Sequence, residues 1–194
     1  MFDGMIDTCK HNQVPTEIVR KIMKVESSKN QLSINVNHDG KSLVSFNPKT
    51  KLEAKKIAIE WMNKGYTIDV GVMQLNSENF SKFNISIDEA LEPCTNIKVA
   101  STIYNNFYKL TNKNDNEILR IQQALSGYNT GNLLYGFKNG YVAKYEISSS
   151  DLVAVVDKKE LKKYAESLLA MRFPVGGKIS LSTLRNSNIK GTSY

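Results

Sequence analysis

The chain has 194 residues, of which 41% are hydrophobic and 23% charged, and its formal net charge is +7 at pH 7. This size suits one globular domain with a sizeable core and a tail, and the absence of any run of 18 apolar residues argues against a membrane-spanning helix. Scattered lysines are typical of a solvated surface; without a docking motif they do not predict nucleic-acid binding, although the charge suits a polyanion such as the bacterial cell wall.

The first predicted helix runs from Pro15 to about Ser28, because proline suits the first helical turn. Steps of 100° per residue place an apolar stripe on one side of this helix and lysines on the other. Residues 29–49 are rich in Asn, Ser, Asp and Gly, and predict a loop with a short strand at 43–46. A second helix is expected over 51–64, closed by a glycine.

Residues 68–75 alternate in polarity and predict a strand or turn that leads into a short helix. Ser86 and Glu89 have the spacing of a capping box, so another short helix is expected to begin there and to end at Pro93. Further helices are predicted over 96–110, 114–127 and 141–147. The expected fold class is α+β and predominantly helical, with one domain over 1–147 and a C-terminal extension over 148–194 that has a helix around 158–171 and then a flexible tail.

Glu26 does not fit the pattern of the first helix. It falls inside the apolar stripe, between Ile22 and Val19, so its carboxylate faces the core or a cleft. Burial of the charged form is unfavourable, so the group must be paired, hydrogen-bonded or held with a raised pKa. A raised pKa is what a general acid needs at neutral pH. The alternative is a glutamate on the last helical turn that leans into water.

Four short motifs occur in an informative order. They are Glu26-Ser27, Gly71-Val72-Met73-Gln74, Ser126-Gly127-Tyr128-Asn129 and Gly140-Tyr141-Val142. Together they resemble the motif set of the soluble lytic transglycosylases and goose-type lysozymes. The subgroup that accompanies type IV secretion and conjugation systems is most similar, because it shares the long insert at 36–67 and the run Pro93-Cys94-Thr95-Asn96. The chain departs from the usual pattern at Asn35, where Ser or Gly is frequent, and at Asn76, where an apolar residue is common.

The resemblance implies a lysozyme-like fold with a cleft and little β structure, and a peptidoglycan lytic transglycosylase that uses no cofactor. Glu26 would be the single catalytic acid and base, cleaving the β-1,4 bond between N-acetylmuramic acid and N-acetylglucosamine and forming a 1,6-anhydro ring. Tyr128 would hydrogen-bond the Glu26 carboxylate, and Asn129 would bind an acetamido group. Gln74 and Met73 would line the cleft, and Gly71 would let the backbone approach the glycan. The expected substrate-binding residues also include Tyr141 and Ser27. The Ser27 hydroxyl is expected to form a hydrogen bond at the helix end rather than to act as a nucleophile.

Two rival functions stay open. A lysozyme-type hydrolase would use the same Glu26 with water, and Asp69 is the auxiliary carboxylate that could hold that water, with Asp39 the other nearby acid. A weakly active wall-binding scaffold for secretion-system subunits is the second rival. Two histidines and no Cys-x-x-Cys leave too few ligands for a zinc site, so no metal is expected.

Cys9 and Cys94 are compatible with one disulfide or with two buried thiols. The resemblance favours a bond that joins the two ends of the domain. Residues 1–4 lack the basic and apolar features of a secretory signal, so either the protein is cytosolic or a signal has been removed. The resemblance implies the second, and therefore a periplasmic protein whose partners are peptidoglycan strands and type IV secretion-system subunits. We expect a monomer.

Overall fold

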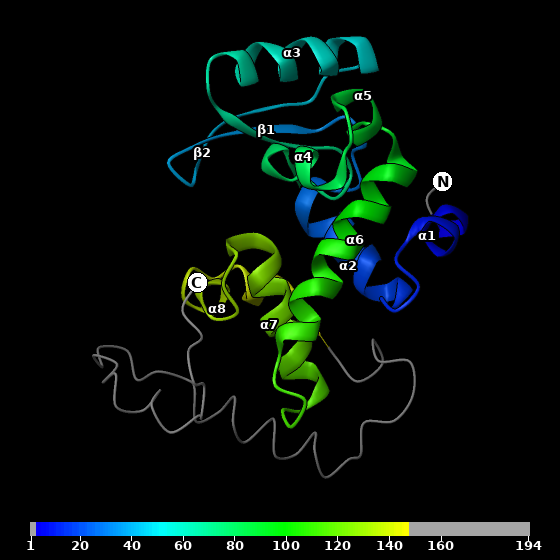
Figure 1. Ribbon diagram of the computed structural model, residues 1–194, viewed down its shortest axis with the longest axis vertical. Coiled ribbons are helices and arrows are strands. Elements are labelled where there is room, and N and C mark those ends of the chain that lie inside the picture. Colours follow the sequence, from blue (N-terminus) through cyan, green and yellow to red (C-terminus); the bar gives the residue numbers. More distant parts are fainter. Residues whose placement is uncertain (1–2, 148–194) are drawn as a thin grey trace. The chain divides into compact units, whose positions relative to one another are not determined.

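The structure is a computed structural model that describes residues 3–147. The extension over 148–194, with its expected helix around 158–171, lies outside the described residues. The described chain is predominantly helical with one small sheet, as the sequence predicts (Figure 1). Its helices are α1 (Asp3–Cys9), α2 (Thr16–Ser27), α3 (Lys51–Asn63), α4 (Phe80–Phe83), α5 (Ile87–Ala90), α6 (Pro93–Leu110), α7 (Glu117–Thr130) and α8 (Tyr135–Lys138), with 3-10 turns at Ser77–Asn79 and Val142–Lys144.

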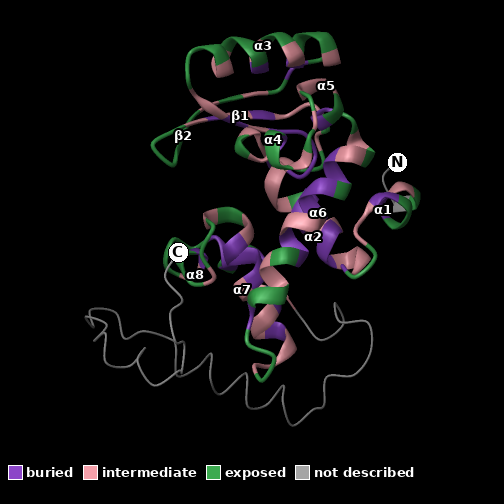
Figure 2. Cartoon of the chain, viewed as in Figure 1, coloured by how far each residue is buried: buried purple, intermediate pink, exposed green. Residues whose placement is uncertain are grey.

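The sheet is antiparallel with strand order β2-β1-β3-β4. Its strands are β1 (Ile34–His38), β2 (Lys41–Phe46), β3 (Thr67–Val70) and β4 (Leu75–Asn76). Because successive side chains of a strand point to opposite faces, one face is apolar and the other polar. The apolar face packs against α3, whose side toward the sheet is buried while its outer side is exposed (Figure 2). The polar face is therefore not used for packing against α3, and its side chains are available for a functional site.

A second core surrounds α2. The apolar stripe of this helix is fully buried and packs against residues of α6 and α7. This second core includes Ile18, Val19, Ile22, Met23, Ile97, Ala100, Tyr104, Ile121, Ala124 and Leu125. This packing fixes the last turn of α2, which carries Glu26, between the sheet and the segment that follows α8.

Several predicted boundaries were wrong. Residues 34–38 form β1 although they were expected in a loop, and α6 begins at Pro93 although its start was expected at 96. Proline suits the first turn of a helix, so Pro93 begins α6 as well as limiting the short helix before it. The N-cap of α7 is Asn116, not Asn114, and the helix expected over 141–147 is only a 3-10 turn. The capping box at Ser86 is confirmed.

The Cys9–Cys94 disulfide joins α1 to the first turn of α6. It closes a loop with a sequence separation of 85 residues, so it restricts the unfolded chain strongly. The bond that the resemblance favoured is therefore present. None of the helices described between residues 3 and 147 combines the length and the hydropathy needed to cross a membrane.

Candidate active site

Glu26 lies on the last turn of α2, directly after the apolar residues that anchor the helix. Its side chain meets the segment that follows α8, where the Tyr141 hydroxyl donates a hydrogen bond to Oε1 of Glu26. The Tyr141 and Tyr145 hydroxyl oxygens are 2.7 Å apart, so the two tyrosines form a hydrogen-bonded pair above the carboxyl group. The Glu26 residue as a whole has intermediate exposure, while its carboxyl group is largely buried.

The surroundings of Glu26 raise the pKa of its carboxyl group from 4.5 to about 7. Burial is the largest cause, because the charged form loses its hydration. The negative charge of Asp69 also raises this pKa, while the hydrogen bond from Tyr141 and the positive charge of Lys144 lower it in part. A carboxyl group with this pKa is about half protonated at neutral pH, so it can both donate and accept a proton.

Asp69 lies on the polar face of the sheet, in a row that crosses all four strands. Asn35 of β1 pairs with Ser45 of β2 and with Asp69 of β3, and Asp69 pairs with Asn76 of β4. Nδ2 of Asn76 donates to Oδ1 of Asp69 at 2.8 Å. The other carboxylate oxygen accepts from Nδ2 of Asn37 at 2.7 Å and from Nδ2 of Asn35 at 3.4 Å.

This cage of amides offsets part of the effect of burial on Asp69, whose pKa is raised overall. Burial raises the pKa of the Asp69 carboxyl group, and the hydrogen bonds from Asn37, Asn76 and Asn35 oppose that rise because they favour the charged form. Asp69 is therefore a second carboxylate that acts on Glu26 through its charge.

The turn between β3 and β4 is held from below by Asn96 of α6. Nδ2 of this fully buried side chain donates to the carbonyl oxygens of Val70 at 2.9 Å and Ala90 at 2.8 Å, and its Oδ1 accepts from the backbone N–H of Met73 at 2.9 Å. Gly71 has a φ of +79°, and a Cβ there would lie 2.4 Å from Nδ2 of Asn96. The close contact with Asn96 and the positive φ thus account for glycine at position 71, and the expected approach of its backbone to a glycan stays a prediction.

Other residues of the turn also have structural contacts. Met73 is fully buried in the core, so its expected place on the cleft wall was wrong. Nε2 of Gln74 donates to the carbonyl oxygens of Gly71 at 2.9 Å and Ser33 at 3.1 Å, which holds the turn closed. The Ser27 hydroxyl donates to the carbonyl oxygen of Val72 at 2.7 Å and so ties the end of α2 to the turn, in keeping with the expected hydrogen bond at the helix end.

The expected partner of Tyr128 was also wrong. The Tyr128 hydroxyl donates to the carbonyl oxygen of Met73 at 2.6 Å, and Tyr141 supplies the hydrogen bond to Glu26 instead. Tyr128 still lies close enough for the Glu26 charge to add to the effect of burial, which together raise the pKa of its hydroxyl well above the usual value. Asn129 is exposed on α7. The structure thus gathers Glu26, Tyr128 and Tyr141.

Sequence reasoning missed Tyr145, Lys144 and the three asparagines around Asp69 as parts of the site. The signals were faint: Tyr145 follows Tyr141 by four residues, and Asn35 and Asn37 alternate with apolar residues along β1. The described residues 3–147 contain no group of three or more His, Cys, Asp or Glu placed to hold a metal ion.

Comparison with known proteins gives one family and several relatives. Residues 5–150 match the sequence model of the transglycosylase SLT domain. The chain is 34% identical over 152 residues to protein virB1 of Agrobacterium fabrum, which covers 78% of this chain and 60% of that protein. It is 30% identical over 173 residues to type IV secretion system protein virB1 of Brucella suis biovar 1, which covers 84% of this chain and 70% of that protein.

The same Brucella protein name recurs in Brucella abortus biovar 1, at 29% identity over 171 residues. The chain thus spans about 60% of the length of the Agrobacterium relatives that it matches. No solved structure matches the chain at a significant level.

Proposed function

The chain belongs to the transglycosylase SLT family, and from that premise we propose that it is a peptidoglycan lytic transglycosylase with Glu26 as its single catalytic acid and base. The observation that carries this proposal is the environment of Glu26, whose carboxyl group has a pKa raised to about 7 by burial and is oriented by Tyr141. Such a group holds a proton in the free enzyme and can take one back later in the reaction.

The first step is acid catalysis. The protonated Glu26 carboxyl group donates its proton to the glycosidic oxygen, and the C1–O bond breaks with its electron pair passing to that oxygen. The adjacent N-acetyl group of the muramic acid stabilises the positive charge at C1. Asp69 supports this step from the sheet, because its fixed negative charge favours a positive charge nearby.

The second step is base catalysis by the same side chain. The Glu26 carboxylate removes the proton from the 6-hydroxyl of the same sugar, and that oxygen bonds to C1, which closes the 1,6-anhydro ring. No water is consumed, and the carboxyl group regains its proton. Since the nucleophile belongs to the sugar, proximity replaces the second carboxylate that activates water in most glycosidases.

The roles proposed for other residues follow their contacts. Ser27, Gly71 and Gln74 shape the wall of the site through the turn that Asn96 holds. Tyr128 fixes that turn from α7, and the exposed Asn129 beside it is free to bind an acetamido group of the sugar. Tyr141 orients the acid.

A hydrolase is the second candidate, and Asp69 favours it. Its carboxylate is held on the polar face of the sheet and acts on Glu26, as expected for a residue that positions a water molecule near C1. Digestion of purified peptidoglycan sacculi followed by mass spectrometry separates the two reactions, because the anhydro product is lighter than the hydrolytic product by one water.

The test of the proposed function compares the wild type with Glu26→Gln. We expect anhydro-muropeptides from the wild type, and a loss of at least about a hundredfold in rate from the variant because general acid catalysis is lost. Glu60→Gln is the matched control, since Glu60 is exposed on α3 and pairs with Lys64. Intact activity in Glu26→Gln, or equal loss in both variants, contradicts the proposal.

We further propose that the enzyme acts in the periplasm and opens the wall locally for a type IV secretion or conjugation apparatus. The names of the Brucella relatives supply the secretion context, and the disulfide suits an oxidising compartment. Peptidoglycan strands and secretion-system subunits are the proposed partners. The test is complementation: a strain that lacks this protein should regain secretion with the wild type, and Glu26→Gln should not restore it.

A further inference from the structure

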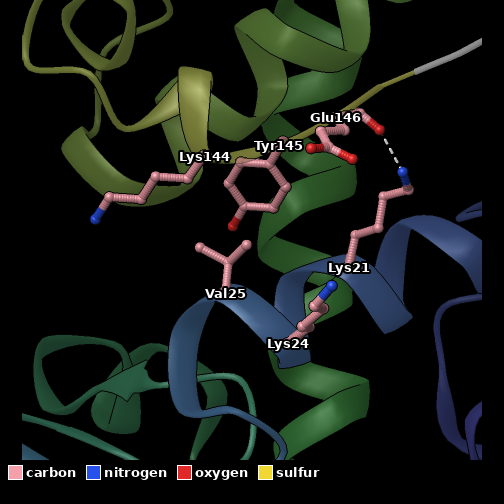
Figure 3. A pocket seen from close by; sticks show the side chains of 6 residues that line it. All are labelled: Lys21, Lys24, Val25, Lys144, Tyr145 and Glu146. Atoms are coloured by element: carbon pink, nitrogen blue, oxygen red, sulfur yellow. Dashed lines mark hydrogen bonds between the residues drawn. The ribbon is translucent and has the colours of Figure 1, made fainter.

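A small cavity lies between α2 and the segment from Lys144 to Glu146 (Figure 3). Its volume is about 150 Å³, which exceeds the roughly 30 Å³ that one water molecule takes in the liquid. It therefore has room for a carboxylate group and part of the chain that bears it. The lining residues are Lys21, Lys24, Val25, Lys144, Tyr145 and Glu146.

The charge of this cavity is positive. Three of its six lining residues are lysines and one is a glutamate. Lys21 donates from Nζ to the backbone carbonyl oxygen of Glu146, which ties the two walls together. The amino groups of Lys21 and Lys24 lie on one side of Tyr145, and that of Lys144 extends to the other side (Figure 3). An anion in the cavity therefore meets the two lysines of α2.

The cavity shares two walls with the active site. Val25 precedes the catalytic Glu26 on α2, and Tyr145 contacts the hydroxyl of Tyr141, which is bonded to Glu26. A group bound here thus contacts Tyr145, whose hydroxyl is hydrogen-bonded to that of Tyr141, the partner of Glu26. The aliphatic surface of Val25 and the ring of Tyr145 suit the apolar part of a ligand, while the lysines suit its charge.

We infer that this cavity is an anion subsite for a carboxylate of the stem peptide on the muramic acid bound beside Glu26. The inference rests on the proposed function, since it assigns a further part of that same substrate. The stem peptide is attached to the sugar whose glycosidic bond is cleaved, and it carries free carboxylates. One of them entering the cavity meets lysine side chains, so the peptide-bearing strand binds more tightly than the bare glycan.

The test uses the full chain and two substrates, namely peptide-bearing glycan strands and the same strands freed of peptide by an amidase. The readout is the ratio of kcat/KM for the peptide-bearing strand over the bare strand. Two solvent-exposed charge pairs of modest strength predict a ratio of roughly three- to tenfold for the wild type. A third substrate, with its stem carboxylates converted to methylamides, separates the charge of the peptide from its bulk.

The decisive variant is Lys24→Gln, followed by Lys21→Gln/Lys24→Gln. We expect the ratio to fall toward one in both, and the methylamide substrate to behave like the bare strand with the wild type. Lys56→Gln is the matched control, because Lys56 is exposed on α3, on the other side of the sheet. Lys144 is left unchanged, since its charge acts on the pKa of Glu26.

Three results overturn the inference. They are a wild-type ratio of one, a ratio that the two α2 variants keep, and an equal fall in the Lys56→Gln control. In each of these cases the anhydro product from bare strands still supports the proposed function. A wild type that cleaves none of the substrates contradicts the proposed function itself, so the two failures are distinguishable.

Discussion

Replacing Glu26 by Gln should remove a pH-dependent loss of stability. The carboxyl group has a pKa of about 7 in the folded chain against its ordinary value of 4.5, so the folded state binds the proton more tightly. The stability that this proton contributes is complete below pH 4.5, declines as the pH rises to 7 and is lost above that. The gap between the two pKa values corresponds to about 3 kcal/mol. Glutamine has no proton to lose and keeps an oxygen that accepts from Tyr141.

Urea unfolding of both proteins at pH 5 and pH 8 measures this effect. The free energy of unfolding of Glu26→Gln minus that of the wild type should be larger at pH 8 by about 2 to 3 kcal/mol. Taking the difference cancels the titration of groups that do not interact with Glu26, whereas Asp69 is coupled to Glu26 and contributes to the difference. An equal difference at the two pH values would mean that Glu26 titrates alike in the folded and unfolded chain, which would refute its description as a buried acid.

Two other substitutions test the surroundings of this acid. Tyr141→Phe removes a hydrogen bond that favours the charged carboxylate, so the pKa of Glu26 should rise and the alkaline limb of the kcat/KM profile should move to higher pH. The kcat should fall by roughly tenfold, because the acid loses its fixed orientation. An alkaline limb that does not move contradicts this prediction. Gly71→Ala should lower the free energy of unfolding by about 3 kcal/mol, because its Cβ would overlap Asn96 at a positive φ. Gly65→Ala shares the positive φ but has open space around it, so thermal unfolding should show a loss of only about 1 kcal/mol.

The helices were predictable because their signals are local. The apolar stripe of α2, the N-terminal proline and the capping box at Ser86 are each read within a few residues. Strand β1 was missed because its asparagines favour a loop, although Ile34 and Val36 alternate with Asn35 and Asn37. Pairing with β2 and β3 and burial against α3 override that local preference.

The catalytic acid could be predicted but its partner could not. Glu26 was recognisable because the helical periodicity of residues 15–28 places its carboxylate among apolar side chains, where a charged group is not expected. Tyr128 and Tyr141 are both tyrosines near the end of the described chain, and only the packing of α7 and α8 against α2 decides which hydroxyl reaches the carboxyl group. That choice depends on residues 115 positions apart, beyond the reach of periodicity.

The asparagines at 35 and 76 explain why this chain can keep a second carboxylate beside its acid. Both positions depart from the pattern of the resembling family, and both side chains donate to Asp69. A buried carboxylate without donors would take up a proton, and a neutral Asp69 would no longer raise the pKa of Glu26. Loss of either amide would therefore bring the two carboxyl groups closer to sharing a proton. The departures are thus coupled through Asp69: the amides keep it charged, and its charge helps Glu26 retain the proton that the first step requires.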